Sequence, residues 1–306
     1  LVESRPAEMV RLEKCSLTID NTSTQSGAYH PDVAFFRVRA APGAGSLIAG
    51  EGTPVARRTA IALADCMLRG EAVVVRAQDL WPFEFSWENG LLVTTERLLA
   101  ADGGERVPAA GESIRISLQH VTAVVRAGLC RFSQGSLGPR LLSTQVDCRN
   151  SILAGGPAAS LVEHLDATAV DAARQGFAWN GDRNFYEGFS NFWSIRVAAS
   201  SSAEVMPFEA WREYWGAERE SVPNWNRVQW RQLPAADRPV PAQLPSDYAL
   251  NPSTTSANAA IGAASDGRDV GCLFDRLPEV ASPPQPAATP DPPAQPESDP
   301  GPPKGA

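Results

Sequence analysis

An eight-residue pattern that returns along the chain restricts the possible folds more than any other feature of the sequence. Each copy begins with two large or apolar residues one position apart, and its sixth and eighth positions are mostly apolar or small. The six copies are VRLEKCSL from Val10, IALADCML from Ile61, FSWENGLL from Phe85, ISLQHVTA from Ile116, VDCRNSIL from Val146 and FAWNGDRN from Phe177. From Ile61 onward the copies start 24, 31, 30 and 31 residues apart.

The fifth position of each copy predicts a corner between two strands. Positions one and three follow the alternation of a strand, but positions six and eight have the opposite parity, so one flat strand cannot point all four inward. The fifth residues are Lys14, Asp65, Asn89, His120, Asn150 and Gly181. Because Gly, Asn, Asp and His accept positive φ most readily, we expect a strand, a two-residue corner and a second strand in each copy.

A third apolar run after each copy completes the predicted repeat. These runs begin at Val33, Ala72, Arg97, Leu129, Ser160 and Phe192. Self-similarity at a period of roughly 20 to 50 residues indicates a solenoid. The sequence therefore predicts an all-β, right-handed parallel β-helix (β-solenoid) of about six or more rungs. The alternative is an ordinary β-sandwich, whose short strands and turns can also be regularly spaced.

One short helix is predicted after the last repeat. Phe208, Trp211 and Trp215 lie at i, i+3 and i+7, between Pro207 and Gly216. This spacing gives one apolar face, which we expect to cap the open end of the coil. The alternative is an aromatic platform for sugar rings, formed by tryptophans 211, 215, 225 and 230.

Composition divides the chain into two predicted parts. Residues 1–275 are expected to form the β-helix, truncated at its N-terminal end and carrying a helical insertion at 205–217. Residues 276–306 are expected to be a disordered Pro-rich tail, because the segment after Pro278 has no aromatic residue and cannot bury enough apolar surface to fold. The chain opens with Leu1 and enters its first copy within ten residues, which suggests a fragment of a longer polypeptide.

Charge and cysteine usage exclude several classes of function. The net charge of −8 and the absence of any basic run longer than Arg57-Arg58 argue against nucleic acid as a partner. The sequence has no run of about 20 apolar residues, so no membrane span is expected. Four of the five cysteines are interpreted as interior side chains, and Cys272 is left without a role. With no Cys-x-x-Cys or Cys/His cluster, neither a metal nor a cofactor is expected.

Two sets of residues are candidates for a functional site. For catalysis, Asp182, Arg183 and Glu187 supply acidic and basic groups close together in the sequence, as cleavage of a polysaccharide requires. We place Asp182 at the inward sixth position of its copy, so a structural capping role competes with catalysis.

For ligand binding, a basic row is predicted. Arg76 and Arg131 each lie 15 residues after the start of a copy, and His164 and Arg196 end neighbouring third runs. Parallel strands would space such residues about 4.8 Å apart, and an anionic glycan could lie along them. Solvated surface arginines explain the pattern equally well. The three histidines do not cluster, so no arrangement of nucleophile, histidine and acid is indicated.

A family resemblance becomes specific near the end of the repeats. Tyr248, Leu250, Pro252 and Ser253, followed by the run Asp-Gly-x-Asp-x-Gly from Asp266, resemble the terminal signature of bacterial right-handed parallel β-helix repeat proteins. The runs WENGLL from Trp87, SILAGGPAASLVEH from Ser151 and WNGDRNFYEG from Trp179 are similar to β-helix regions of large planctomycete surface proteins. Some of those proteins are receptor-like serine/threonine kinases.

The resemblance implies an extracytoplasmic or cell-surface location. We expect a non-catalytic β-helix module that binds carbohydrate or another surface ligand, and the resemblance allows it to be the C-terminal region of a kinase whose catalytic domain lies outside this chain. One alternative is a polysaccharide lyase or glycosidase of the β-helix class. The other is a structural spacer.

Overall fold

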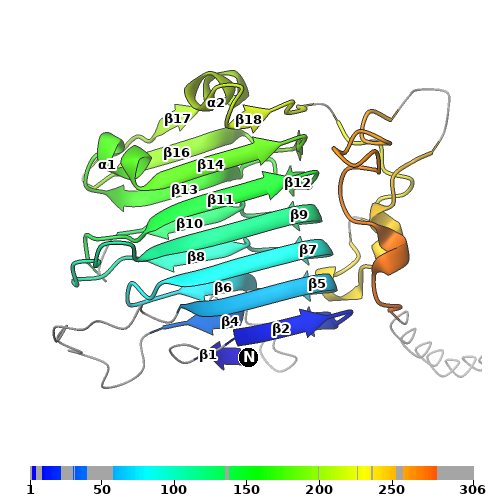
Figure 1. Ribbon diagram of the computed structural model, residues 1–306, viewed down its shortest axis with the longest axis horizontal. Helices are drawn as coiled ribbons and strands as arrows, with labels where there is room; N and C mark the ends of the chain where they lie inside the picture. Colours follow the sequence, from blue (N-terminus) through cyan, green and yellow to red (C-terminus); the bar gives the residue numbers. More distant parts are fainter. Residues whose placement is uncertain are drawn as a thin grey trace, which may run out of the picture.

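The chain forms two stacked sheets in which nearly all strands run parallel (Figure 1). The computed structural model describes residues 2–4, 9–21, 30, 32–39, 58–134, 138–198, 200–225, 227–235, 237–252 and 258–280. From β5 onward, the chain passes repeatedly from the ten-stranded sheet to the eight-stranded sheet and back.

The first sheet has eight strands. In spatial order they are β1 (Val2–Ser4), β4 (Ala34–Val38), β6 (Val73–Ala77), β8 (Leu99–Asp102), β10 (Cys130–Ser133), β13 (Ser160–Ala167), β16 (Asn191–Val197) and β17 (Glu204–Met206). Only β17 is antiparallel to its neighbour. The third apolar runs of the sequence supply six of these strands, from β4 to β16.

The second sheet has ten strands. Its main path is β18 (Glu220–Ser221), β14 (Phe177–Asp182), β11 (Ser143–Arg149), β9 (Ser113–Val125), β7 (Phe83–Thr94), β5 (Thr59–Gly70) and β2 (Met9–Glu13). Three shorter strands pair beside this path: β3 (Ser16–Ile19), β12 (Ile152–Gly155) and β15 (Phe185–Glu187). The eight-residue copies therefore all lie in this sheet.

The predicted fold class is wrong. The strands form two mostly parallel sheets, and neither sheet is closed or curled, so the chain is not the right-handed parallel β-helix expected from the repeat. The expectation of three short strands per repeat fails because the two limbs of a copy stay in one sheet. In β5, β7 and β9 they form a single strand of 12 or 13 residues that bends at its fifth copy position.

The predicted corners are present, with one shift. Backbone φ lies between 50° and 53° at the fifth residues Lys14, Asp65, Asn89, His120 and Asn150. In the last copy the pairing places Trp179, not Phe177, beside Val146. The copy therefore starts two residues later, and Arg183 rather than Gly181 adopts positive φ, at 52°.

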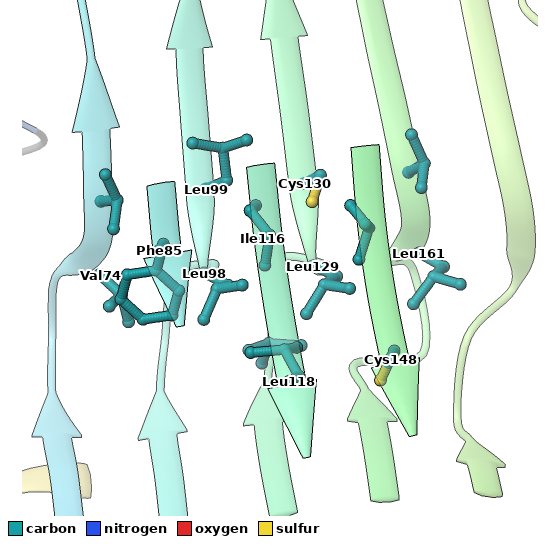
Figure 2. Close-up of a cluster of buried hydrophobic side chains, with 14 of the residues drawn as sticks. Val74, Phe85, Leu98, Leu99, Ile116, Leu118, Leu129, Cys130, Cys148 and Leu161 are labelled. Carbon is teal, nitrogen blue, oxygen red and sulfur yellow. The ribbon is translucent and has the colours of Figure 1, made fainter. Parts of the chain in front are cut away.

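One large hydrophobic core fills the space between the two sheets (Figure 2). From the ten-stranded sheet it takes the first and third positions of each copy, such as Phe85 and Trp87 on β7. The eight-stranded side contributes stacked leucines, among them Leu98, Leu129 and Leu161 on successive turns of the chain. Parallel pairing repeats similar side chains in register, which produces continuous apolar rows through the core.

The helix α2 (Phe208–Trp215) covers the core beyond β14 and β16 (Figure 1). Its apolar face is buried as the spacing predicts, and Trp211 is fully enclosed. The shorter helix α1 (Val170–Gln175) connects β13 to β14. Because the indoles of Trp211 and Trp215 face the core, they do not form an exposed platform for sugars. Trp225 remains 40 % exposed, and its ring stacks on Phe208.

A buried carboxylate joins α2 to the sheets. Glu220 on β18 accepts hydrogen bonds from Trp179 Nε1 at 2.6 Å, from Trp211 Nε1 at 2.9 Å and from the Tyr186 hydroxyl at 3.0 Å. Burial raises the pKa of Glu220 to about 7, although these three donors oppose the rise. A side chain on Gly181 would collide with the Glu220 carboxylate, which explains the glycine on the paired strand.

A C-terminal segment crosses the corners of the ten-stranded sheet (Figure 1). We call residues 258–277 the strap. It includes the 3₁₀ turn η3 (Phe274–Arg276), and two further 3₁₀ turns precede it, η1 (Val240–Ala242) and η2 (Pro245–Tyr248). The segment with the resemblance to a terminal signature ends within this strap.

The strap is held by the corner residues themselves, in reverse chain order. Asn150 exchanges two side-chain hydrogen bonds with Ser265, each 2.9 Å long. Asn89 binds both the amide and the carbonyl of Leu273, and Asp65 forms an ion pair with Arg276 at 3.0 Å. Arg183 also binds the strap, through the carbonyl of Ala263. His120 contacts Asp266 and Gly271 of the strap. The positive-φ corners thus serve as a row of attachment points.

Apolar contacts complete the attachment of the strap. It covers the outward side chains that follow the corners, which include Met67, Leu91 and Ile152. Cys272 is buried among them, its amide donates to the Thr122 hydroxyl at 3.0 Å, and burial raises the pKa of its thiol to about 12. Gly271 passes so close to Thr122 and Ile152 that a Cβ atom would lie 2.6 Å from the Thr122 hydroxyl.

The domain boundaries predicted from composition are only partly covered by the structure. Helix α2 lies inside the predicted insertion 205–217. The strap continues two residues beyond the predicted end of the folded part at 275. The predicted disordered tail lies outside the described residues from 281 onward.

Candidate functional site

A polar face lies on the outside of the ten-stranded sheet, before the corners. Along β7 and β9 the residues up to the corner alternate between buried and accessible, whereas most of those after the corner are buried. The difference follows from the strap, which covers the sheet beyond the corners only. The accessible residues before the corners are the second and fourth positions of each copy.

Two rows of side chains run across the strands on this face. The register places Ser86, Ser117, Asp147 and Asn180 in one row. It places Glu88, Gln119, Arg149 and Asp182 in the other. Neighbouring members of a row are about 4.8 Å apart, the spacing of hydrogen-bonded strands. Hydrogen-bonding groups are therefore repeated at a fixed interval across the sheet.

The face is hollowed into a shallow groove. One part, of about 290 Å³, crosses β2, β5, β7 and β9 and is floored by the small side chains of Ala62, Ala64 and Ser86. A second part, of about 230 Å³, crosses β9 and β11 and is lined by Asp147 and Arg149. Ser117 and Gln119 line both parts, so the groove is continuous over five strands.

The charges along the groove are mixed in sign and are oriented by their neighbours. Asp147 accepts hydrogen bonds from Asn180 and Gln145, both at 2.8 Å. Glu84, which lies at the edge of the same face, pairs with Arg58 at 3.0 Å and with Arg115 at 3.4 Å. A ligand would therefore meet donors and acceptors in alternation rather than a field of one sign.

The three candidate catalytic residues make separate contacts. Asp182 is the fourth residue of its copy, not the sixth, so it lies on the outward row beside Arg149 rather than facing the core. Arg183 is the corner residue and donates to the Ala263 carbonyl of the strap at 3.3 Å. Glu187 accepts a 3.0 Å hydrogen bond from Trp230, and burial raises its pKa. Only Asp182 belongs to the polar face.

The predicted basic row lies on the other sheet and is interrupted. Arg76 and Arg131 do share one register line, with Ala100 between them. Arg76, however, forms ion pairs with Asp32 at 3.3 Å and with Asp102 at 3.5 Å. The next residue on the line after Arg131 is Glu163, which pairs with Arg97 at 3.2 Å. Carboxylates thus neutralise much of the charge that the row was expected to offer.

The remaining two members of the basic row are not part of this line. His164 points into the core, where its ring stacks on Phe132 at 4.7 Å between centroids, and desolvation lowers its pKa to about 4. A neutral, buried imidazole cannot bind an anionic glycan. Arg196 is exposed near the end of β16, at the irregularity in the register between β16 and β13.

Comparison with known proteins does not assign the chain to a family. No family model, curated protein or solved structure matches the chain.

Neither a metal centre nor a membrane segment was found in the described part of the chain. No three His, Cys, Asp or Glu side chains gather there as metal ligands would. Among the same residues, no helix has the length and apolar character needed to cross a bilayer. Within the described residues, the groove is the candidate site.

The residues that line the groove were not predicted, because the repeat is defined by the inward positions of each copy. The signal was present at the second and fourth positions, which are Ala62 and Ala64 on β5 but polar on the next four strands of the copies. Small and polar residues repeated at outward positions indicate a shaped, accessible face. These positions line one face only when neighbouring strands pair in register, and the sequence of a single copy does not specify that register.

Proposed function

We propose that this chain is a non-catalytic module that binds carbohydrate, or another extended polar surface ligand, along the groove of the ten-stranded sheet. The observation that carries the proposal is the continuous groove with its two rows of hydrogen-bonding side chains. A polysaccharide repeats its hydroxyl groups at regular intervals. This face repeats hydrogen-bonding side chains at regular intervals.

The shape of the groove favours a polymer over a small molecule. A site for a small ligand is a cleft that encloses most of the ligand surface. This groove is shallow and open, and with five strands it extends over about 20 Å. Many weak polar contacts along a chain would supply affinity here, and the floor of Ala62, Ala64 and Ser86 leaves room for the ligand backbone.

The biological setting belongs to the same proposal. The resemblance of three repeat segments to planctomycete surface proteins supports an extracytoplasmic location. A ligand-binding region of a receptor-like kinase would use such a groove for recognition. Kinase chemistry is not proposed for these residues.

The test is retention by immobilised polysaccharides, using a panel of neutral, uronate-containing and sulfated polymers. We expect at least one polymer to retain the protein without being shortened. Arg149→Ala should weaken that retention by roughly tenfold, the value of a hydrogen bond that involves a charged group. Gln119→Ala should weaken it by roughly fivefold, because its amide is uncharged. Arg196→Ala, an exposed arginine of the opposite sheet, is the matched control and should bind normally.

Each other outcome has a defined meaning. A shortened polymer would support the alternative of a lyase or glycosidase, and Asp182 would then be the first residue to substitute. Loss of retention in Arg196→Ala but not in the groove variants would move the site to the eight-stranded sheet. No retention by any polymer would favour a structural spacer.

A further inference from the structure

Two cysteines lie side by side at the end of the ten-stranded sheet where the first copy pairs with the second. β5 pairs with β2 up to Ala64 and with β3 from Met67, and the register is the same on both sides. Cys15 therefore lies beside Cys66, the residue before Met67. The Met67 amide donates to the Cys15 carbonyl at 2.9 Å, so strand pairing continues across this point.

The backbone at this pair is within the reach of a disulfide bond. Parallel strands place the Cα atoms of paired residues about 4.8 Å apart, and disulfides span about 4.4 to 6.8 Å between Cα atoms. Both side chains take the sixth position of their copies, and both pack against the core. Cys66 Sγ lies 3.1 Å from the Ala64 carbonyl oxygen of its own strand and 3.5 Å from that of Leu12 on β2. The Cys66 sulfur thus leans toward the first copy.

Both side chains are free thiols in the structure. We propose that Cys15 and Cys66 form a disulfide bond when the chain meets a small disulfide oxidant, and that this bond fastens the first copy to the second.

The unequal exposure of the two thiols sets the order of the reaction. Cys15 is partly exposed, whereas Cys66 is fully buried and burial raises the pKa of its thiol. Cys15 Sγ attacks one sulfur of the oxidant, and the other half leaves as a thiol with the proton of Cys15. Cys66 Sγ then attacks the Cys15 sulfur, and the second half leaves with the proton of Cys66. One oxidant disulfide is thereby reduced to two thiols, while the cysteine pair loses two electrons and two protons.

The first copy has a strand neighbour on one side only. In the described part of the chain, β2 and β3 pair with β5 alone, and Val10 and Leu12 are only partly buried. An edge strand can move the roughly 1 Å that brings two Cβ atoms from strand spacing to disulfide spacing. The bond would close a loop of about 50 residues, and a cross-link over that length stabilises the fold by restricting the unfolded chain. Met9 and Arg11 of β2 line one end of the groove, which the bond would also fix.

The other three cysteines do not share this arrangement. In the described strands, neither Cys130 nor Cys148 has a cysteine beside it on a neighbouring strand. Cys272 lies in the strap, where its amide donates to Thr122. All three side chains are buried, and burial raises the pKa of the Cys130 and Cys272 thiols to about 12. These three thiols should therefore stay reduced under conditions that oxidise the pair.

The test is incubation of the full chain with oxidised glutathione at pH 8, followed by intact mass measurement and peptide mapping without reduction. We expect the mass to fall by roughly 2 Da, the two hydrogens lost, and the peptide with Cys15 to be linked to the peptide with Cys66. The amides of Lys14 and Met67 donate across the two strands. They should exchange with solvent at least roughly tenfold more slowly in the oxidised protein than in the reduced protein.

Three variants separate the steps. Cys66→Ala should stop at the first step and carry one glutathione on Cys15. Cys15→Ala should remain unmodified, because its remaining thiols are buried. Cys272→Ala is the matched control and should form the link as the wild type does.

Several results would overturn the proposal. These are two free thiols in the treated wild type, a stable glutathione adduct on Cys15 while Cys66 is present, or a disulfide that involves another cysteine. Unchanged exchange of the Lys14 and Met67 amides in the linked protein would show that the bond does not fasten the first copy.

Discussion

Trp211 is the residue of α2 on which the end of the core depends most. It has no exposed surface and contacts the rings of Trp179, Trp193 and Trp215 edge-on. Trp211→Ala would leave a large cavity and would remove one donor from Glu220. We expect a loss of about 3 to 5 kcal/mol in the free energy of unfolding, measured by urea denaturation.

The control for this prediction is Trp225→Ala, on the same aromatic cluster. Its indole is 40 % exposed, so its removal should cost much less than that of Trp211. If both variants unfold at the same urea concentration as the wild type, the burial of Trp211 is not what stabilises this end of the molecule.

Glu220 should make stability depend on pH in an unusual direction for a carboxyl group. Its pKa in the folded chain is raised to about 7 from an ordinary 4.5, so the folded state binds the proton more tightly. The resulting stabilisation is complete below about pH 4.5 and is lost as the pH rises through 7. The difference between these pKa values corresponds to about 3 kcal/mol.

Urea unfolding of the wild type and of Glu220→Gln between pH 4.5 and pH 8 would measure this effect. In the wild type, the free energy of unfolding should fall as the pH rises through 7. In Glu220→Gln, the part of this fall that comes from Glu220 should be absent. Glu209→Gln, an exposed glutamate on α2, should keep the wild-type slope. If the free energy of unfolding depends on pH in the same way in Glu220→Gln as in the wild type, burial does not keep the Glu220 carboxyl group protonated.

Single residues also show what the sequence can reveal. Five of the six corners were predicted correctly, since Lys14, Asp65, Asn89, His120 and Asn150 all have positive φ. The sixth was displaced because Phe177 and Trp179 both fit the first position of a copy. Strand pairing selects Trp179, and the corner then falls on Arg183, a residue type that carries no local preference for positive φ.

At the scale of elements, the strands were predictable and their division between sheets was not. The six third runs became strands of one sheet because each has a short apolar stretch. The two limbs of a copy were expected to separate at the corner, yet in β5, β7 and β9 hydrogen bonding to the neighbouring strands continues across it. Continuity of pairing is a property of neighbouring strands together, which the sequence of one strand does not contain.

The strap could not be predicted as a structural element either. It has no apolar periodicity and is attached through side chains of distant residues, among them Asn89 and Asp65. We expect a chain that ends at residue 257 to melt several degrees lower than the full chain and to bind a hydrophobic dye, because Met67, Leu91 and Phe185 would lose their cover.

The matched control is a chain that ends at Val280, which keeps the strap and removes the Pro-rich segment. From its composition, that segment should contribute nothing to the melting temperature. Equal melting temperatures for the two truncated chains would show that the strap does not stabilise the sheets.

At the scale of the whole molecule, the two sheets divide their tasks. Their inner faces bury one core, the strap closes the outer face beyond the corners, and the outer face before the corners remains open as the groove. The sequence predicted the core through its inward positions. It did not predict the groove, because the rows that line it arise only when the strands stand in register.

The most direct test of the groove is carbodiimide labelling of its carboxylates with and without a polysaccharide that retains the protein. Glu88, Asp147 and Asp182 should be labelled more slowly when the polymer is bound, because they lie on the rows that it would contact. Glu204 and Glu209, which are exposed on other elements, should be labelled at an unchanged rate. Unchanged labelling of all three groove carboxylates, with protection elsewhere, would contradict the assignment of the binding site to this face.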